Sequence, residues 1–176
     1  MPLPPLTTAR LLLRQRHISD VPAILAMNTD PEVMRFVGDG RIPDPVELER
    51  RTRARVDTDF GLGLGYWSLF LRTRPDDYLG YVVLSPVPQS ADIELSYGIR
   101  RDAWGHGLAA EGSRAALDFG FRQRGLPEIV ALTYHANVRS QRVIAKLGFA
   151  PAGIRNAYGQ DLLYFRLGRD AYLATA

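Results

Sequence analysis

Short runs of apolar residues recur along the chain and are separated by polar or proline-containing turns, a pattern typical of β-strands. Residues 66–71, 79–84 and 93–99 carry the aromatic and β-branched side chains that favour strands. The segments 75–77 and 86–88 are rich in turn residues and are expected to be loops. We therefore predict an antiparallel meander in the middle of the chain.

A strand followed by a helix is predicted at the start of the chain. Residues 10–15 form the strand. Ser19 or Asp20 can cap the helix, which has Pro22 as its second or third residue and continues through Met27. This order, strand then helix, opens the predicted fold.

Two more helical segments precede the meander and are separated by a glycine-rich turn, residues 38–43. We expect these three segments to form walls of a substrate cleft. The predicted elements are helices at 31–37, 45–59, about 108–124 and 137–147, and strands at 128–133, 149–154 and 162–167. Interleaving of this kind predicts a mixed α+β topology.

The length and composition bound the number of domains. A chain of 176 residues with 46% hydrophobic content can bury one sizeable core and is short for two ordinary domains. No internal repeat or glycine–serine linker divides it. We expect a single domain over residues 1–176.

Several classes of chemistry are excluded or disfavoured by composition. The chain has no cysteine, which rules out disulfides, thiolate metal ligands and cysteine nucleophiles. Its three histidines, His17, His106 and His135, are scattered, so no metal site is predicted. The net charge is +3, but the densest arginine cluster, at 50–55, is flanked on the predicted helix by Glu47, Glu49, Asp57 and Asp59, which favours a solvated helix face over a nucleic-acid surface.

The chain also lacks an apolar run long enough to span a bilayer, and its first five residues lack the features of a signal peptide. We therefore expect a cytoplasmic protein with no membrane partner. The signatures of a Walker P-loop, a serine-hydrolase elbow and an H-E-x-x-H zinc helix are absent. The glycines of residues 61–66 precede a strand where a dinucleotide fold needs a helix, so this segment is predicted to be a flexible loop.

The most informative motif begins where the predicted strand 93–99 ends. Trp104, Gly105, His106 and Gly107 lead directly into a helix, whose first backbone N–H groups have no partner within the helix and point in one direction. Such a corner is a site for phosphate groups. It is also a common way to cap a helix, and by itself it leaves both interpretations open.

A second block strengthens the first. It runs from Asn137 to Phe149 and ends in Leu147-Gly148-Phe149, a helix stop followed by a strand. With these two blocks the chain resembles the GCN5-related N-acetyltransferases (GNAT), and within them the branch that acetylates the N-termini of ribosomal proteins and small amines. The resemblance covers nearly the whole chain.

The resemblance implies a GNAT fold. This is a mixed, mostly antiparallel sheet of about seven strands, with helices on both faces and a splay between the fourth and fifth strands. It also implies acetyl-CoA as the cosubstrate, with the pyrophosphate held by backbone N–H groups, and no metal. The family pattern is Arg or Gln, two residues, Gly, one residue, then Gly or Ala, and Gly107 and Ala109 match its last two positions. Trp104 stands at the first position, a departure that this branch often shows. The expected coenzyme-binding residues are Ser96, Tyr97, Gly98, Ile99, Trp104, Gly105, His106, Gly107, Leu108, Ala109, Ala110, Asn137 and Ser140.

Two residues are candidates for catalysis. Glu94 alternates with Ile93 and Leu95, so it is expected to face away from the core toward a cleft and to act as the base; a salt-bridged surface role is the alternative. By the resemblance, Ser140 lies near the departing sulfur, and Ile144 stands where other branches have a tyrosine acid. Asn137 is expected to cap its helix, to bind the coenzyme arm, or both.

The acceptor is left open by the sequence. A protein or peptide N-terminal α-amine is the first choice, and a small amine such as a polyamine, an amino acid or an antibiotic is the alternative. A non-catalytic acyl-CoA-binding adaptor is the rival from another class. The sequence does not fix the oligomeric state, for which a homodimer is the expectation. Four residues lie on segments that would line the acceptor pocket in a GNAT layout, although each also fits an ordinary core or surface role: Phe36, Trp67, Tyr158 and Asp161.

Overall fold

The structure is a computed structural model that describes residues 2–56, 58, 60–61 and 63–175. Its centre is one eight-stranded sheet with the order β1-β2-β3-β4-β5-β6-β8-β7. Neighbouring strands are antiparallel except for β5 and β6, which are parallel. The strands are β1 (Leu6–Thr7), β2 (Leu11–Gln15), β3 (Tyr66–Leu71), β4 (Arg74–Pro86), β5 (Ile93–Ile99), β6 (Glu128–Thr133), β7 (Ala150–Ala157) and β8 (Gln160–Gly168).

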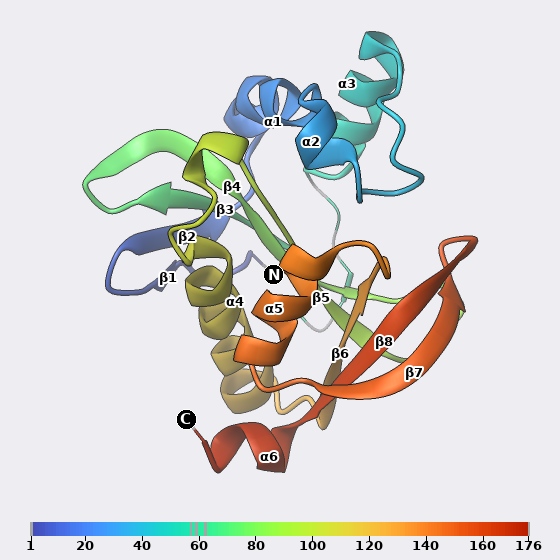
Figure 1. Cartoon of the computed structure of the whole chain (residues 1–176). Helices are drawn as coiled ribbons and strands as arrows, with labels where there is room; N and C mark the ends of the chain where they lie inside the picture. The colour runs from blue at the N-terminus through green and yellow to red at the C-terminus, as the bar shows by residue number, and fades with distance from the viewer. Residues whose placement is uncertain (1, 57, 59, 62, 176) are drawn as a thin grey trace.

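Apart from α6 near the C-terminus, the helices gather in two groups, as Figure 1 shows: α1, α2 and α3 lie together at one end of the molecule, and α4 and α5 lie side by side against the sheet. A π-helical turn, η3 (Phe119–Gln123), extends α4, and two 3-10 turns, η1 (Ile18–Asp20) and η2 (Arg101–Ala103), precede α1 and α4. The helices are α1 (Val21–Asn28), α2 (Pro31–Met34), α3 (Pro45–Ala54), α4 (Leu108–Asp118), α5 (Val138–Lys146) and α6 (Arg169–Leu173).

Alternation along the strands divides the core between the two faces of the sheet. Leu11 and Leu69 point to the face covered by α4, where they join a large buried cluster with Leu117. Phe70 points to the other face and packs with Met27 of α1 in a separate cluster. The helices therefore cover both faces, as predicted, and the mixed α+β fold is confirmed.

The splay predicted between the fourth and fifth strands lies between β5 and β6, because the unpredicted β1 moves the strand numbers up by one. Glu94 stands opposite Val130, and within these two fully described strands no other pair of residues is in register. On its other side β5 is fully paired with β4, from Gly80 opposite Ile99 to Pro86 opposite Ile93. The two parallel strands therefore separate beyond Glu94 and leave one edge of β5 without a partner strand.

Some boundaries differ from the prediction. The segment 75–77 is not a loop but the start of β4, because a tight turn at 72–73 closes the β3–β4 hairpin. Pro75 is tolerated there because this part of β4 extends past β5 and needs to pair on one side only. The third helix ends at Ala54 rather than at residue 59, since buried Val56 turns into the interior. Asp57 and Asp59 of that predicted helix, and Leu62 of the predicted loop, lie outside the described residues.

The short strand β1 and the terminal helix α6 were not predicted, and β1 brings the sheet to eight strands. Asp20 stands at the N-cap of α1, but its side chain forms no capping bond there. Among the described residues, no helix is long and apolar enough to cross a bilayer.

Candidate functional site

The glycine-rich corner after β5 has the geometry of an anion site. Gly107 is the N-cap residue of α4, with φ +76°, a left-handed conformation that favours glycine, and it offers no side chain to cap the helix. Gly105 also has a positive φ, +82°. The first N–H groups of α4, at Leu108, Ala109 and Ala110, therefore lack the side-chain acceptor that a Ser or Asp cap would supply. These groups are free to bind a phosphate.

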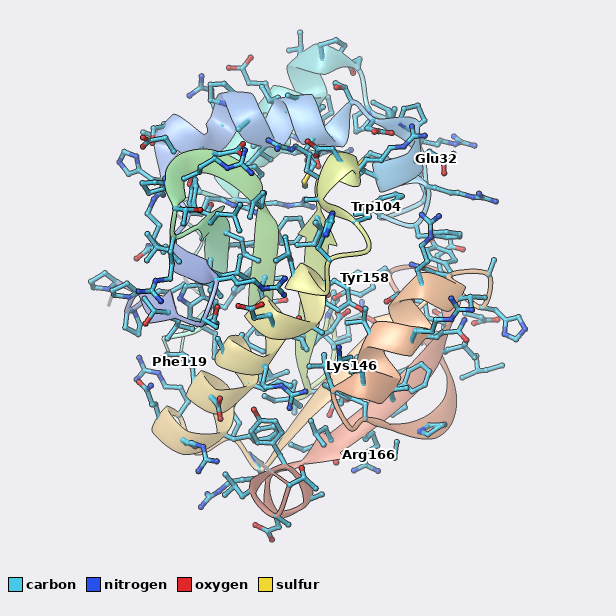
Figure 2. All side chains as sticks on the ribbon, turned by 60° about the vertical axis from the view of Figure 1, so that its left-hand side comes forward. Glu32, Trp104, Phe119, Lys146, Tyr158 and Arg166 are labelled. Atoms are coloured by element: carbon cyan, nitrogen blue, oxygen red, sulfur yellow. The ribbon has the colours of Figure 1, made fainter. Side chains whose placement is uncertain are left out.

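Trp104 supports this corner from behind. Its indole Nε1 donates a hydrogen bond to the carbonyl oxygen of Ile99 at 2.7 Å, which ties the loop to the end of β5. The guanidinium of Arg139 on α5 lies over the indole ring, 4.8 Å from its centroid. Figure 2 labels Trp104 just before α4. The indole thus holds the starts of α4 and α5 together, and its N–H is already used within the protein.

The unpaired edge of β5 is a strip of backbone next to the corner. Arg100 N–H donates to Leu79 O at 2.8 Å, and pairs alternate along an antiparallel ladder, so the backbone groups of Gly98 and Ser96 also face β4. The backbone of Tyr97 between them faces β6, which has moved away. Of the four residues 96–99 expected to hold the coenzyme arm, Tyr97 is the one whose N–H and C=O both remain available at the gap.

The start of α5 lies close to this strip. Asn137 caps α5 by accepting a hydrogen bond from Ser140 N–H through Oδ1 at 3.2 Å, so its capping role is present. The hydroxyl of Ser140 lies 2.9 Å from the hydroxyl of Tyr97. Burial raises the pKa of Tyr97 to about 12, so the phenol keeps its proton at neutral pH. The pairing of Tyr97 with Ser140 was not anticipated from the sequence, which used only the backbone of Tyr97.

Glu94 is buried at the point where the strands separate. Its side chain is on the opposite face of β5 from Tyr97, as alternation predicts, and the residue is only 4% exposed. Oε1 accepts a hydrogen bond from Ser96 Oγ at 2.7 Å, and Oε2 accepts one from the hydroxyl of Tyr158 at 2.5 Å. Burial raises the pKa of Glu94, and these two hydrogen bonds partly oppose the rise. A carboxylate with a raised pKa is better suited to accept a proton than an exposed one.

Tyr158 is one of the residues expected to line the acceptor pocket, but the sequence did not reveal its contact with Glu94. It lies in the turn between β7 and β8, 64 residues from Glu94, and is 52% exposed. Its φ is +56°, unusual for a residue other than glycine. The sequence signal for such a turn is the glycine that follows, Gly159, but this signal does not indicate which strand the turn approaches.

The other three residues expected to line the acceptor pocket make their contacts elsewhere. Trp67 is fully buried on the α4 face, where its ring meets Phe119 edge-on, so it belongs to the core and not to a cleft beside Glu94. Phe36 packs against Tyr134, with ring centroids 6.0 Å apart. Asp161 is exposed and accepts a hydrogen bond from Asn156. Neither of these contacts reaches Glu94.

A cavity of about 680 Å³ runs along α4 on the side of β1. It shares His106 and Gly107 with the glycine-rich corner but does not include Glu94, Tyr97 or Ser140. His106 is exposed and lines this cavity, which does not include Glu94, so it is not placed to act as the base. The cavity therefore extends the glycine-rich corner and is separate from Glu94, Tyr97 and Ser140. Its walls are Pro5, Leu6, Thr7, Thr8, Arg10, His106, Gly107, Ala110, Glu111, Arg114, Ala115, Asp118, Phe119, Gln123 and Lys146.

Comparisons with known proteins each found acetyltransferases. A family model described as an acetyltransferase (GNAT) domain matches residues 10–150. The uncharacterized N-acetyltransferase YnaD of Bacillus subtilis (strain 168) is 28% identical over 148 residues, which is 84% of each chain.

Two solved structures have the same fold. RimL, a ribosomal L7/L12 α-N-protein acetyltransferase in complex with coenzyme A, has a TM-score of 0.77 at 15% identity, over 96% of this chain and 99% of that one. Spermidine N-acetyltransferase from Vibrio cholerae, in complex with CoA and spermine, has a TM-score of 0.76 at 19% identity, over 94% and 99%. At such identities the likeness concerns the fold alone.

Proposed function

This chain belongs to the GNAT acetyltransferase family, and on that premise we propose that it transfers the acetyl group of acetyl-CoA directly to the α-amine of a protein or peptide N-terminus. The observation that carries the proposal is the position of Glu94. Its buried carboxylate lies at the last paired position of β5 and β6, next to the open edge of β5 that leads to the glycine-rich corner. The proposed proton acceptor, Glu94, therefore lies next to the strand edge that is proposed to bind the coenzyme arm.

The residues present fit coenzyme A. The first N–H groups of α4 suit the pyrophosphate, because Gly107 has no Cβ to keep a diphosphate away from the backbone. The free N–H and C=O of Tyr97 suit the amides of the pantetheine arm, which can pair with an open strand edge. The cavity along α4 offers room for the nucleotide end beside His106 and Gly107.

The acceptor chemistry fits an α-amine better than a lysine side chain. An α-amine has a pKa of about 8, so roughly a tenth of it is neutral at pH 7, whereas a lysine amine is neutral about 300 times less often. For the α-amine, a single carboxylate such as Glu94 is sufficient to accept the proton. The amine attacks the thioester carbonyl, its proton passes to Glu94 directly or through water, and the C–S bond breaks to release the thiolate.

Ser140 is proposed to assist the leaving thiolate. A free thiol has a pKa of about 8.5, so its thiolate leaves with little help and one hydrogen bond is enough. If the hydroxyl of Tyr97 donates to Ser140 Oγ, the proton of Ser140 is directed outward, toward the sulfur. The chain has no cysteine, so transfer through a cysteine acyl-enzyme is excluded.

The proposal is tested in two stages. Calorimetric titration with acetyl-CoA should give one-to-one binding, with NADPH and ATP as controls at the same salt concentration. Mass spectrometry should then show a single acetyl group on the N-terminus of test peptides, none on peptides whose N-terminus is blocked, and little on spermidine. Glu94→Gln should keep acetyl-CoA binding and lose most turnover. Acetylation of spermidine in preference to every peptide would assign the small-amine alternative instead, and binding without turnover would assign the adaptor.

A further inference from the structure

A buried cation lies on the same face of the sheet as Glu94. Arg16, directly after β2, is only 5% exposed, and its Nε is enclosed without a hydrogen-bond partner. Its guanidinium lies over the ring of Tyr66, 3.9 Å from the centroid, and 5.2 Å from that of Tyr81. Among the described residues no carboxylate forms an ion pair with Arg16, whereas Arg14 is paired with Asp20. Burying an unpaired charge is costly, so this arginine needs an explanation.

The position of Arg16 relative to Glu94 follows from strand register. Arg16 N–H donates to Tyr66 O, Tyr66 is opposite Val83, and Val83 is opposite Ser96, so these residues form one row across β2 to β5. Ser96 in turn donates to Glu94. The guanidinium lies above β3, two strands from β5, which places it roughly 10 Å from Glu94 at the usual spacing of strands.

A second cation reinforces the positive end of this row. Burial raises the pKa of Tyr81, and the charges of Arg16 and of Arg55, which follows α3, oppose the rise. The hydroxyl of Tyr81 is thus within electrostatic reach of both arginines. At the opposite end, Ser96 and the hydroxyl of Tyr158 each donate a hydrogen bond to Glu94. One side of the face is therefore positive and the other holds the proton acceptor.

We propose that Arg16 binds a carboxylate of the acceptor, so that the enzyme selects peptide N-termini with an acidic side chain near the third residue. The inference rests on the proposed function. An extended chain covers roughly 3.3–3.6 Å per residue, so an amine at Glu94 and a carboxylate at Arg16 are about three residues apart. A free amino acid carries both groups on one carbon and is too short, and a polycation is repelled by the two arginines.

The test compares peptides that differ only in charge. kcat/KM is measured, by release of free thiol at saturating acetyl-CoA, for the amidated tetrapeptides Ala-Ala-Asp-Ala, Ala-Ala-Asn-Ala and Ala-Ala-Lys-Ala. The native enzyme should prefer the Asp peptide to the Asn peptide roughly tenfold to a hundredfold, as expected for a charged hydrogen bond. Arg16→Gln should remove this preference by lowering kcat/KM for the Asp peptide alone.

Arg124 provides a matched control. It also has an enclosed Nε without a partner and lies over an aromatic ring, that of Phe119 at 4.9 Å, but on the α4 face. Arg124→Gln should keep the preference for the Asp peptide. Acetylation of all three peptides at similar kcat/KM by the native enzyme, or an unchanged preference in Arg16→Gln, would overturn the inference and leave the proposed function standing. If no peptide is acetylated, the proposed acceptor and this inference both fail. The native comparison decides the matter even if Arg16→Gln does not fold.

Discussion

The hydroxyl of Tyr158 donates a 2.5 Å hydrogen bond to Oε2 of Glu94 and connects the turn between β7 and β8 to the centre of the sheet. This contact joins the edge of the sheet to the point where β5 and β6 separate. It also fixes the rotation of the Glu94 carboxylate, because Ser96 holds the other oxygen. A carboxylate has about four lone-pair sites, so two donors leave the others available to accept a proton.

Removing the Tyr158 hydroxyl should shift the pH dependence of turnover. The hydrogen bond lowers the pKa of Glu94, so Tyr158→Phe should raise that pKa further above its ordinary value. The base is then protonated at a higher pH, and the acidic limb of the kcat/KM profile moves upward. At a pH on that limb we expect a loss of about 2- to 10-fold, the worth of one hydrogen bond. Tyr164→Phe removes a weaker contact to Asp92 and should leave the limb in place. An unmoved limb in Tyr158→Phe would exclude Glu94 as the titrating base.

Gly107→Val should weaken acetyl-CoA binding by at least roughly tenfold, the loss expected when charged hydrogen bonds to a phosphate are removed. The φ of +76° also strains any side chain, at about 1–2 kcal/mol of folding stability. Gly125→Val separates the two effects, because Gly125 has a φ of +64° and open space around it, away from the corner. Calorimetry should show normal affinity in Gly125→Val and lost affinity in Gly107→Val, with similar shifts in Tm. Equal affinities in the two variants would contradict the phosphate site.

Tyr97→Phe tests the pair of hydroxyls at the start of α5. The substitution removes the hydroxyl that lies 2.9 Å from Ser140 Oγ and keeps the backbone that is proposed to hold the pantetheine arm. We expect kcat to fall by about 2- to 10-fold with KM for acetyl-CoA unchanged, in line with the loss of one hydrogen bond. The effect should disappear in the background of Ser140→Ala, since both changes act on the same proton. Additive losses in the double variant would show that Tyr97 acts independently of Ser140.

Asp20→Asn should destabilise the fold in a pH-dependent way. Burial by itself raises the pKa of Asp20, but hydrogen bonds from Arg14, His17 N–H and Ser68 bring it below its ordinary value. A lowered pKa means that the ionised carboxylate stabilises the fold above the unfolded pKa of about 4, and that this contribution is lost as pH falls through the folded value. Urea unfolding should show a loss of about 1.5–3 kcal/mol at pH 7, because the charge-assisted hydrogen bonds between Arg14 and Asp20 are weakened, and a smaller loss near pH 3. A loss that is the same at both pH values would show that Asp20 acts through packing.

Much of the site was determined by the sequence alone, because it depends on neighbouring residues. The strand that ends in glycines and turns into a helix is a local signal, and Gly107 takes the left-handed N-cap that such a signal requires. The face on which Glu94 lies follows from its alternation with Leu95. Asn137 is a cap because its short side chain can reach the N–H of Ser140, three residues on. Each of these features involves residues that are close in the chain.

The partners of those residues were decided by the tertiary structure. Tyr158 reaches Glu94 across 64 residues, and Tyr97 reaches Ser140 across 43, distances at which periodicity carries no information. An aromatic residue such as Trp67 could line a pocket, but the pairing of β3 with β2 places it in the core. Nothing in the sequence distinguishes Arg16 from a surface arginine, and only strand pairing places it in one row with Ser96. Local patterns determine which way a side chain points, and only the order and register of the strands determine what it meets there.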